Sequence, residues 1–323
     1  MSSRPLLAPL VPLYRLAVSL RAERLRRGWE QVRRLEWPVV SIGNLSAGGA
    51  GKTPLTIALA QALKKHGVAV DVLSRGYGRS SKVAARVKAN GTAEEFGDEP
   101  LLIARATGAP VFVARQRCEA GRLAELDQNQ KKIHLLDDGF QHRQLYRDVD
   151  LLLISGRELA DTLLPAGNLR EPLEAFRRAS VLVIPAEELA TEASLRALGW
   201  IGPLWRIRRR MEVPPLAGPV VAFCGIARPE QFFSGLEQAG VPFAARRAFA
   251  DHHRYTAHDL AQLEAMAATH KATLLTTEKD AARLGAGLPG LQTASLVTCI
   301  EDEPRCVEWL IKQLSAFSHQ PSA

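Results

Sequence analysis

The sequence is poor in cysteine and in aromatic residues, and it contains no long hydrophobic run. The four cysteines form no closely spaced pair, which argues against a zinc site or a disulfide framework and is typical of buried thiols in a reducing compartment. Aromatic residues are 6% of the chain and do not alternate with basic ones, so we expect no nucleic-acid partner. No stretch reaches the roughly 20 apolar residues of a membrane-spanning helix.

What the chain does have is the composition of a folded protein with an excess of positive charge. Its 323 residues can form one large or two smaller cores, and 46% of them are hydrophobic while 24% are charged. The net charge of +8 favours an anionic partner such as phosphate groups, nucleic acid or an acidic membrane surface, without choosing among them.

The N-terminal segment, residues 1–35, combines an uncharged stretch with a dense group of arginines. Residues 5–14 carry no charge, and basic residues follow from Arg15 to Arg34. No cleavage site of small residues follows, so a signal peptide fits poorly. Two interpretations stay open: a basic amphipathic helix that associates with a membrane surface, or a terminal helix packed on the domain. The apolar residues with helical spacing are Leu10, Leu13, Tyr14, Ala17 and Leu20.

Short apolar runs alternate with helical patterns along most of the chain. This alternation predicts an α/β fold in which a parallel sheet is covered by helices on both faces. The predicted strands cover residues 38–43, 68–73, 110–114, 133–137, 150–154, 180–184, 219–225, 273–277 and 295–300, and the clearest helices cover 53–66, 116–126 and 186–198.

A basic, Pro-rich segment interrupts this pattern near residue 203 and divides the chain. We predict a first α/β domain over 36–202, a linker with a short strand-like piece over 203–217, and a second, smaller α/β lobe over 218–300. A C-terminal helix and tail are expected over 301–323.

The stretch SAGGAGKT, from Ser46 to Thr53, resembles a phosphate-binding loop with one departure. The usual pattern has Gly, four residues and then Gly-Lys-Ser/Thr, whereas Ser46 stands at the place of the first Gly. A predicted strand enters the stretch and a helix leaves it, so main-chain amides and the helix dipole can hold phosphate oxygens. Lys52 is expected to reach the β- and γ-phosphates, and Thr53 to bind Mg²⁺. The whole loop comprises Ser46, Ala47, Gly48, Gly49, Ala50, Gly51, Lys52 and Thr53.

A pair of carboxylates supports the nucleotide interpretation. Asp137 and Asp138 end an apolar predicted strand, and an aspartate at a strand end near Mg²⁺ is the partner that a phosphate loop needs. A lone aspartate there is more often a turn residue. Because both motifs lie on strand ends of one predicted sheet, they predict an NTPase-like, P-loop domain.

Nucleotide binding alone does not separate a kinase from a hydrolase, and the candidate catalytic residues are individually weak signals. Asp98 precedes a predicted helix and could equally cap it, Arg75 and Arg79 flank a Gly-rich turn, and Arg170 precedes another helix start. His252 and His253 follow Asp251, with no third ligand at zinc spacing.

Together, the motifs are much more specific. The segments GNLSAGGAGKTP, LSRGYGR, GDEP, LLDDGFQH, LREP, FADHHRYT and TTEKD occur in this order between residues 43 and 280. This set resembles the tetraacyldisaccharide 4′-kinase family of lipid A biosynthesis, and the resemblance covers most of the chain, including the basic N-terminal segment.

The resemblance implies an ATP- and Mg²⁺-dependent kinase on the cytoplasmic face of the bacterial inner membrane. Its acceptor is the 4′-hydroxyl of an acylated glucosamine disaccharide 1-phosphate, a glycolipid. Asp98 would accept the hydroxyl proton with the help of His252, for which His253 is the alternative. The resemblance also implies Lys52 in phosphoryl transfer, Asp137 and Asp138 at the metal, Arg170 at the transferring phosphoryl and His142 near the substrate. We expect Asp138 to take part in catalysis as well, and we assign Arg75 and Arg79, from their place on the Gly-rich turn, to substrate binding.

The competing interpretation is a membrane-associated P-loop ATPase switch of the partitioning or metallochaperone type. Such proteins use similar loops but do not need Asp98 or the histidine pair. The segment TTEKD, residues 276–280, resembles a guanine-reading motif, but a helix start capped by Thr277 explains it equally well. ATP is therefore preferred over GTP on the family resemblance.

Overall fold

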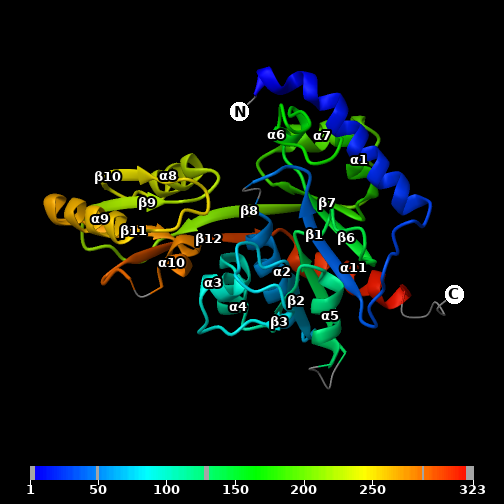
Figure 1. Cartoon of the computed structure of the whole chain (residues 1–323), viewed down its shortest axis with the longest axis horizontal. Coiled ribbons are helices and arrows are strands. Elements are labelled where there is room, and N and C mark those ends of the chain that lie inside the picture. The colour runs from blue at the N-terminus through cyan, green and yellow to red at the C-terminus, as the bar shows by residue number, and fades with distance from the viewer. Residues whose placement is uncertain (1–3, 49–50, 127–130, 286, 318–323) are drawn as a thin grey trace.

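The structure is a computed structural model that describes residues 4–48, 51–126, 131–285 and 287–317. It consists of two lobes joined side by side, with the N-terminal helix lying across the larger one (Figure 1). Within the described residues the strands form one continuous sheet in the order β10-β9-β11-β12-β8-β7-β6-β1-β5-β2-β4-β3. No described helix has both the length and the apolar composition that crossing a membrane requires.

The larger lobe contains the predicted parallel sheet. Its central strands are buried along their whole length, as expected for strands covered on both faces, and short β3 (Ala85–Arg86) closes the edge antiparallel to β4. The parallel strands are β1 (Val39–Asn44), β2 (Val70–Ser74), β4 (Val111–Val113), β5 (Ile133–Asp137), β6 (Val149–Leu153) and β7 (Val181–Pro185).

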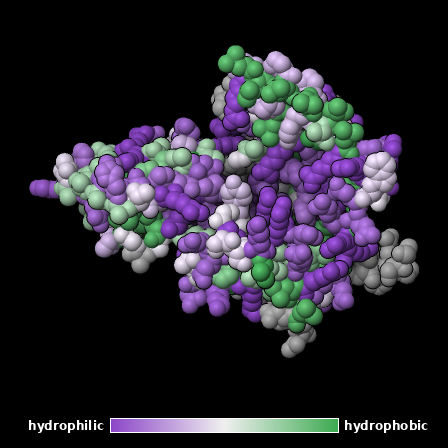
Figure 2. Space-filling view, in the orientation of Figure 1, coloured by the Kyte–Doolittle hydropathy of each residue, from purple (hydrophilic) through white to green (hydrophobic). Residues whose placement is uncertain are grey.

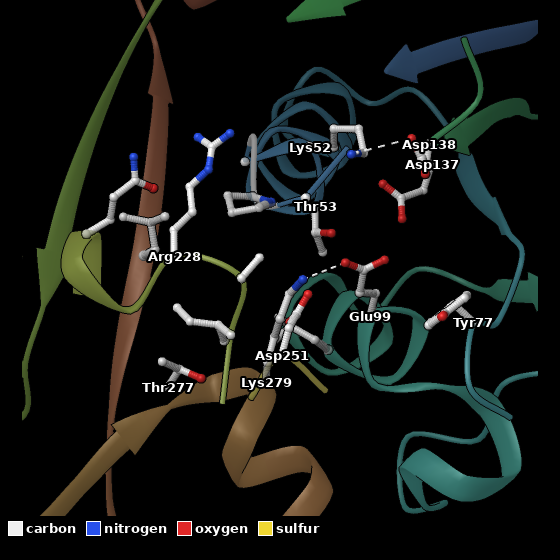
Figure 3. A pocket seen from close by; sticks show the side chains of 18 of the residues that line it. Lys52, Thr53, Tyr77, Glu99, Asp137, Asp138, Arg228, Asp251, Thr277 and Lys279 are labelled. Atoms are coloured by element: carbon white, nitrogen blue, oxygen red, sulfur yellow. Dashed lines mark hydrogen bonds and ion pairs between the residues drawn. The ribbon is translucent and has the colours of Figure 1, made fainter. Parts of the chain in front are cut away.

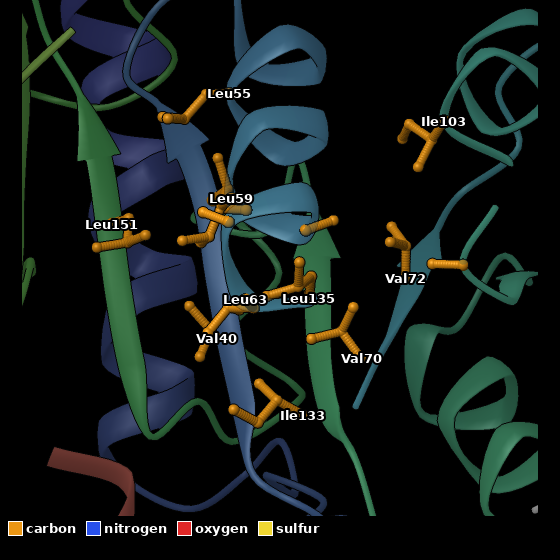
Figure 4. Close-up of a cluster of buried hydrophobic side chains, with 14 of the residues drawn as sticks. Val40, Leu55, Leu59, Leu63, Val70, Val72, Ile103, Ile133, Leu135 and Leu151 are labelled. Atoms are coloured by element: carbon orange, nitrogen blue, oxygen red, sulfur yellow. The ribbon is translucent and has the colours of Figure 1, made fainter. Parts of the chain in front are cut away.

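Helices cover both faces of this sheet, and the larger cluster of apolar side chains lies under α2 (Lys52–Lys65). There Leu55, Leu59 and Leu63, at helical spacing, pack on Val40 and Leu135 (Figure 4). The same cluster includes residues of α4 (Asp98–Thr107) and α11 (Glu303–Phe317), whereas α5 (Arg117–Leu126) packs in a separate cluster. The shorter helices of this lobe are α3 (Ala93–Phe96), α6 (Gly156–Leu159), η2 (Leu173–Arg178) and α7 (Leu189–Ala197).

Two long strands carry the sheet from one lobe to the other. Strand β8 (Leu204–Glu212) pairs in parallel with β7 and antiparallel with β12 (Gln292–Ile300), which in turn pairs with β11 (Thr273–Thr277). The segment predicted as a linker is therefore largely a paired strand, in which buried Trp205 and Ile207 alternate with arginines. The domain boundaries drawn from the sequence remain a prediction.

The smaller lobe repeats the α/β arrangement. Strands β9 (Val220–Cys224) and β10 (Phe243–Ala248) extend the sheet beyond β11. Its helices are α8 (Pro229–Gln238), α9 (Ala257–His270) and α10 (Glu278–Leu284).

The N-terminal segment forms η1 (Pro5–Leu10) and α1 (Val11–Arg26), and only part of it packs on the larger lobe. Val11 and Tyr14 pack on the larger lobe, and the Tyr14 hydroxyl donates to the Arg170 carbonyl oxygen over 3.0 Å. No residue of α1 is fully buried, however, and Leu6, Leu10, Leu13, Leu16 and Leu20 all remain exposed.

A charged network is buried inside the larger lobe, away from the carboxyl ends of the strands. His134 and Asp71 are cross-strand neighbours with no exposed surface, and their Nδ1 and Oδ1 atoms are 2.6 Å apart. His134 Nε2 lies 3.5 Å from Glu125 Oε1, and Trp37 stacks on the imidazole. Burial lowers the pKa of His134, but the bonds to both carboxylates outweigh it and raise the pKa overall.

Asp71→Asn should lower the free energy of unfolding by about 3 kcal/mol, because it leaves the imidazolium without its main partner. Since the His134 pKa is raised on folding, this contribution is complete below the unfolded value of about 6.5 and is lost as the pH rises through the folded pKa. Denaturant unfolding at several pH values measures the difference between the variant and the wild type. A difference that grows with rising pH would contradict the assignment.

Candidate active site

A cleft of about 1160 Å³ lies between the two lobes, at the carboxyl ends of β1 and β5. Its floor is the start of α2, and charged side chains from both lobes line it (Figure 3). Ligands bind at this edge of α/β sheets because the helix N-termini and the loops converge there. The two motifs that predicted a nucleotide site therefore lie at one place, as expected.

The phosphate-binding loop connects β1 to α2. Gly48 and Gly51 have φ of 79° and 84°, values that favour glycine, and Gly51 forms the N-cap of α2. A Cβ at Gly51 would lie 2.8 Å from the Arg209 guanidinium, which would have to shift to accommodate a larger residue. Gly49 and Ala50, which the sequence also places in the loop, lie outside the described residues.

Ser46, at the place of the expected first glycine, is buried and fixed by hydrogen bonds. Its hydroxyl donates to Glu158 Oε1 over 2.6 Å and accepts from Asn44 Nδ2 over 2.8 Å. The next residue, Ala47, donates its amide to the Asn168 carbonyl oxygen over 2.8 Å. Neither anchor, Asn44 nor Glu158, was predicted from the sequence.

Lys52 and the two aspartates face one another across the start of α2. Lys52 Nζ donates to Asn44 Oδ1 over 2.9 Å and lies 3.4 Å from Asp138 Oδ1. The Thr53 side chain is buried and lines the same cleft. Thr56, one turn along the helix, donates its hydroxyl to Asp137 Oδ1 over 3.0 Å. Helix α2 thus contacts both carboxylates.

The two aspartates have opposite electrostatic environments. Burial raises the pKa of Asp137, and the negative charges of Glu99 and Asp138 raise it further, to about 7. Burial also raises the pKa of Asp138, but Lys52 and Arg170 outweigh it and hold that pKa below its usual range. Arg170 Nη1 lies 3.0 Å and 3.1 Å from the two Asp138 oxygens. Glu99, which was not predicted from the sequence as a site residue, is thus part of the site.

Asp98 and His252 meet at the contact between the lobes. Asp98 is 5% exposed, and its Oδ2 lies 3.4 Å from His252 Nδ1. His252 has a φ of 57° and lines the cleft, where its ring lies against Tyr77. The predicted pairing of these two residues across the lobes is present in the structure.

Arg283, which the sequence analysis missed, joins this pair. Its Nε donates to Asp98 Oδ2 over 3.1 Å, and its Nη2 lies 3.2 Å from His252 Nδ1. Burial raises the pKa of Asp98, but the His252 bond and the charges of Arg283 and Lys279 outweigh it and hold that pKa far below its usual range. The bond to Asp98 raises the pKa of His252. The pair is therefore most stable with Asp98 ionised.

His253 points elsewhere, although it is the neighbour of His252 in sequence. Its Nε2 lies 3.0 Å from Asp259 Oδ2, and its ring stacks on Phe249 with centroids 4.7 Å apart. These contacts hold the turn after β10 on α9. His252, not His253, contacts Asp98 in this structure.

The TTEKD segment is the start of α10, as its capping pattern predicted. The Thr277 side chain accepts from the Asp280 amide, and buried Asp280 accepts from the Gly225 amide over 3.0 Å and the Tyr255 hydroxyl over 3.0 Å. Lys279 reaches across the cleft to donate to Glu99 of the larger lobe. The segment therefore supports the contact between the lobes.

The remaining predicted residues separate into two groups. Arg75 and His142, together with Arg117, line a second hollow of about 840 Å³. This hollow shares Asp138 and Arg170 with the main cleft. Burial, with the nearby charge of Arg117, lowers the pKa of His142 to about 3.

Arg79, by contrast, lies against the Gly76 turn and is not among the residues that line either hollow. Its two terminal nitrogens are buried and have no hydrogen-bond partner in the described part of the chain.

Comparison with known proteins finds one family that matches most of the chain. A family model described as tetraacyldisaccharide-1-P 4′-kinase matches residues 3–315. The tetraacyldisaccharide 4′-kinase of Koribacter versatilis is 41% identical over 289 residues, covering 86% of this chain and 88% of its own. That of Neisseria gonorrhoeae is 36% identical over 323 residues, covering 96% and 91%.

A solved structure is similar over nearly the same length. The crystal structure of LpxK from Aquifex aeolicus in complex with ATP matches with a TM-score of 0.78 and 32% identity, covering 96% of this chain and 99% of its own. This chain belongs to the tetraacyldisaccharide-1-P 4′-kinase family.

Proposed function

We propose that this protein transfers the γ-phosphoryl group of ATP to the 4′-hydroxyl of a tetraacylated glucosamine disaccharide 1-phosphate in lipid A biosynthesis. The observation that carries the proposal is the convergence, in one cleft, of the phosphate loop with the Asp98–His252 pair from facing lobes. A switch ATPase does not need a proton acceptor opposite its phosphates. A kinase that phosphorylates a hydroxyl group does need one, because that hydroxyl loses its proton. Family membership points to the same reaction.

The residues at the floor of the cleft suit a nucleotide with Mg²⁺. Thr53, Asp137 and Asp138 offer the oxygen ligands that Mg²⁺ prefers, and Glu99 faces the same space (Figure 3). In the described residues no three His, Cys, Asp or Glu side chains lie close enough to chelate a metal by themselves, so phosphate oxygens and water would complete the coordination. Bound there, Mg²⁺ would neutralise phosphate charge.

The protein's own groups would divide the remaining work. Lys52 and the amides at the start of α2 hold the phosphates, and Arg170 adds positive charge beside Asp138. The Asp98–His252 pair takes up the proton of the acceptor hydroxyl, with His252 exposed to the cleft and the ionised Asp98 stabilising the imidazolium. Because the two residues belong to different lobes, transfer requires the lobes to be closed.

The second hollow suits the phosphate end of the glycolipid. Arg75, Arg117 and His142 line it, and it opens beside Asp138, so a phosphate bound there would lie near the transfer site. Arg79 is better explained as a structural residue of the Gly76 turn.

The N-terminal helix would hold the enzyme on the membrane that contains its substrate. Apolar side chains gather on the outer side of η1 and α1 (Figure 2), while Tyr14, Val18 and Arg21 of the same segment line the cleft. An interfacial helix of this kind places the cleft at the surface of the lipid bilayer. We therefore propose peripheral association with the cytoplasmic face of the bacterial inner membrane.

A phosphotransfer assay tests the proposal. Purified protein with Mg²⁺-ATP should consume ATP only when the tetraacylated disaccharide 1-phosphate is present, and the product should carry one more phosphate at the 4′-position. Equal ATP consumption without the glycolipid would support the ATPase switch instead.

Asp98→Asn should lower kcat by about 10²- to 10⁴-fold, the usual contribution of a positioned proton acceptor, while the affinity for ATP changes little. The amide keeps the shape of the carboxylate, so loss of folding is a lesser concern than with alanine. Asp302→Asn is the matched control, because that side chain is exposed and its φ of 51° tolerates asparagine. Turnover of Asp98→Asn near the wild-type rate would remove Asp98 from the mechanism.

Changing Leu6, Leu13 and Leu20 to Gln should weaken binding to anionic phospholipid vesicles without lowering stability or ATP affinity. These side chains are 94%, 66% and 56% exposed, so the fold does not depend on them. Leu189→Gln with Ile201→Gln is the control, since both are exposed apolar residues away from this helix. Vesicle sedimentation measures the effect, and equal losses in the two variants would contradict an N-terminal membrane contact.

A further inference from the structure

The loop that follows β9 brings the smaller lobe into contact with the phosphate-binding loop. Ile226, Ala227 and Arg228 line the cleft, and a Cβ at Gly48 would lie 3.5 Å from that of Ala227. Arg228 stands at the N-cap of α8, and its side chain extends from the smaller lobe into the cleft on the side of α2 (Figure 3). An arginine from the opposite lobe thus faces the loop that holds phosphates.

The guanidinium of Arg228 differs from those of two other cleft arginines, which are paired with carboxylates. Arg170 is bound to Asp138, and Arg210 is paired with Glu212. Among the residues that the structure describes, no hydrogen bond or ion pair engages Arg228, although its side chain is partly buried. Burial lowers its pKa, and the charge of Glu158 opposes this. Because Glu158 is bound to Ser46, its carboxylate is already engaged.

A partly buried guanidinium without an anion is energetically unfavourable, and a phosphate group is well suited to its planar donors. The carboxylates of Glu158 and Asp161 act against the effect of burial on the pKa of Arg228, and Glu158 lies at the phosphate loop, where it is bound to Ser46. The Arg228 side chain faces the part of the cleft into which a triphosphate bound at the start of α2 would extend.

We propose that Arg228 binds the β- or γ-phosphate of the nucleotide from the smaller lobe, so that closure of the lobes completes the positive charge around the transferring group. This rests on the proposed function for the identity of the nucleotide. Arginines supplied from a second element play this part in other phosphoryl-transfer sites. Arg228 could not be predicted from the sequence, because its segment FCGIARPE contains no phosphate-binding pattern.

Nucleotide binding to Arg228→Gln in the full-length protein tests the proposal. Titration calorimetry with Mg²⁺ should show about 10- to 100-fold weaker binding of ATP, the usual range for loss of a charged hydrogen bond, and unchanged binding of AMP. Arg228→Lys should recover part of the ATP affinity, because it restores the charge without the planar fork. Arg246→Gln is the control: it removes the same charge from the same lobe at a side chain bound to Glu237.

ATP affinity in Arg228→Gln within about twofold of the Arg246→Gln value would overturn the proposal, and so would equal losses for ATP and AMP. Unchanged thermal unfolding is expected, because the Arg228 side chain has no hydrogen-bond or ion-pair partner to lose among the residues that the structure describes. The outcome is separable from the proposed function, since ATP binding can depend on Arg228 even if the glycolipid assay fails.

Discussion

The structure depends on the carboxylate of Asp138, which two cations from different segments share. Lys52 reaches it from the phosphate loop and Arg170 from the loop before η2. The Arg170 amide also donates to the Leu45 carbonyl oxygen over 2.7 Å, and its own carbonyl accepts from Tyr14 of the N-terminal helix. The Asp138–Arg170 pair therefore links the end of β5, the phosphate loop and the helix that we propose to lie on the membrane. A shift of this pair would displace all three segments.

The contact between the lobes is made largely of charges. Arg283 bonds to Asp98, Lys279 bonds to Glu99, and His252 approaches Asp98. Ion pairs of this kind can be exchanged for contacts with ligand phosphates more readily than a packed apolar surface can be opened. The sheet itself continues between the lobes through β8 and β12, so closure is expected to bend these strands rather than to move a free linker.

Sequence reasoning predicted the elements that have a local signature. The buried strands are largely apolar runs, and the glycines at positions 48 and 51 of the predicted phosphate-binding loop take positive φ. It did not find Asn44, Glu158 or Arg283, because these common residue types acquire a role only through contacts distant in sequence. The arginines of β8 obscure its period-two alternation, so the sequence predicts a linker with only a short strand-like piece where the structure has a paired strand. His252 could not be separated from His253, because a left-handed residue decides which one turns toward Asp98.

The central claim is that the loop ending at Gly51 binds the phosphates of Mg²⁺-ATP. Its most direct test compares the Mg²⁺-dependent affinity for ATP of Gly51→Ala with that of Gly67→Ala. Both glycines have positive φ and flank the same helix, so both substitutions cost about 1 kcal/mol of backbone strain. Only Gly51 belongs to the phosphate-binding loop, where the added methyl group would also displace the Arg209 guanidinium, whereas nothing lies within 4 Å of it at Gly67. The account predicts that Gly51→Ala loses Mg²⁺-dependent ATP binding and Gly67→Ala keeps it. Equal affinities in the two variants, or no Mg²⁺-dependent binding by the wild type, would contradict it.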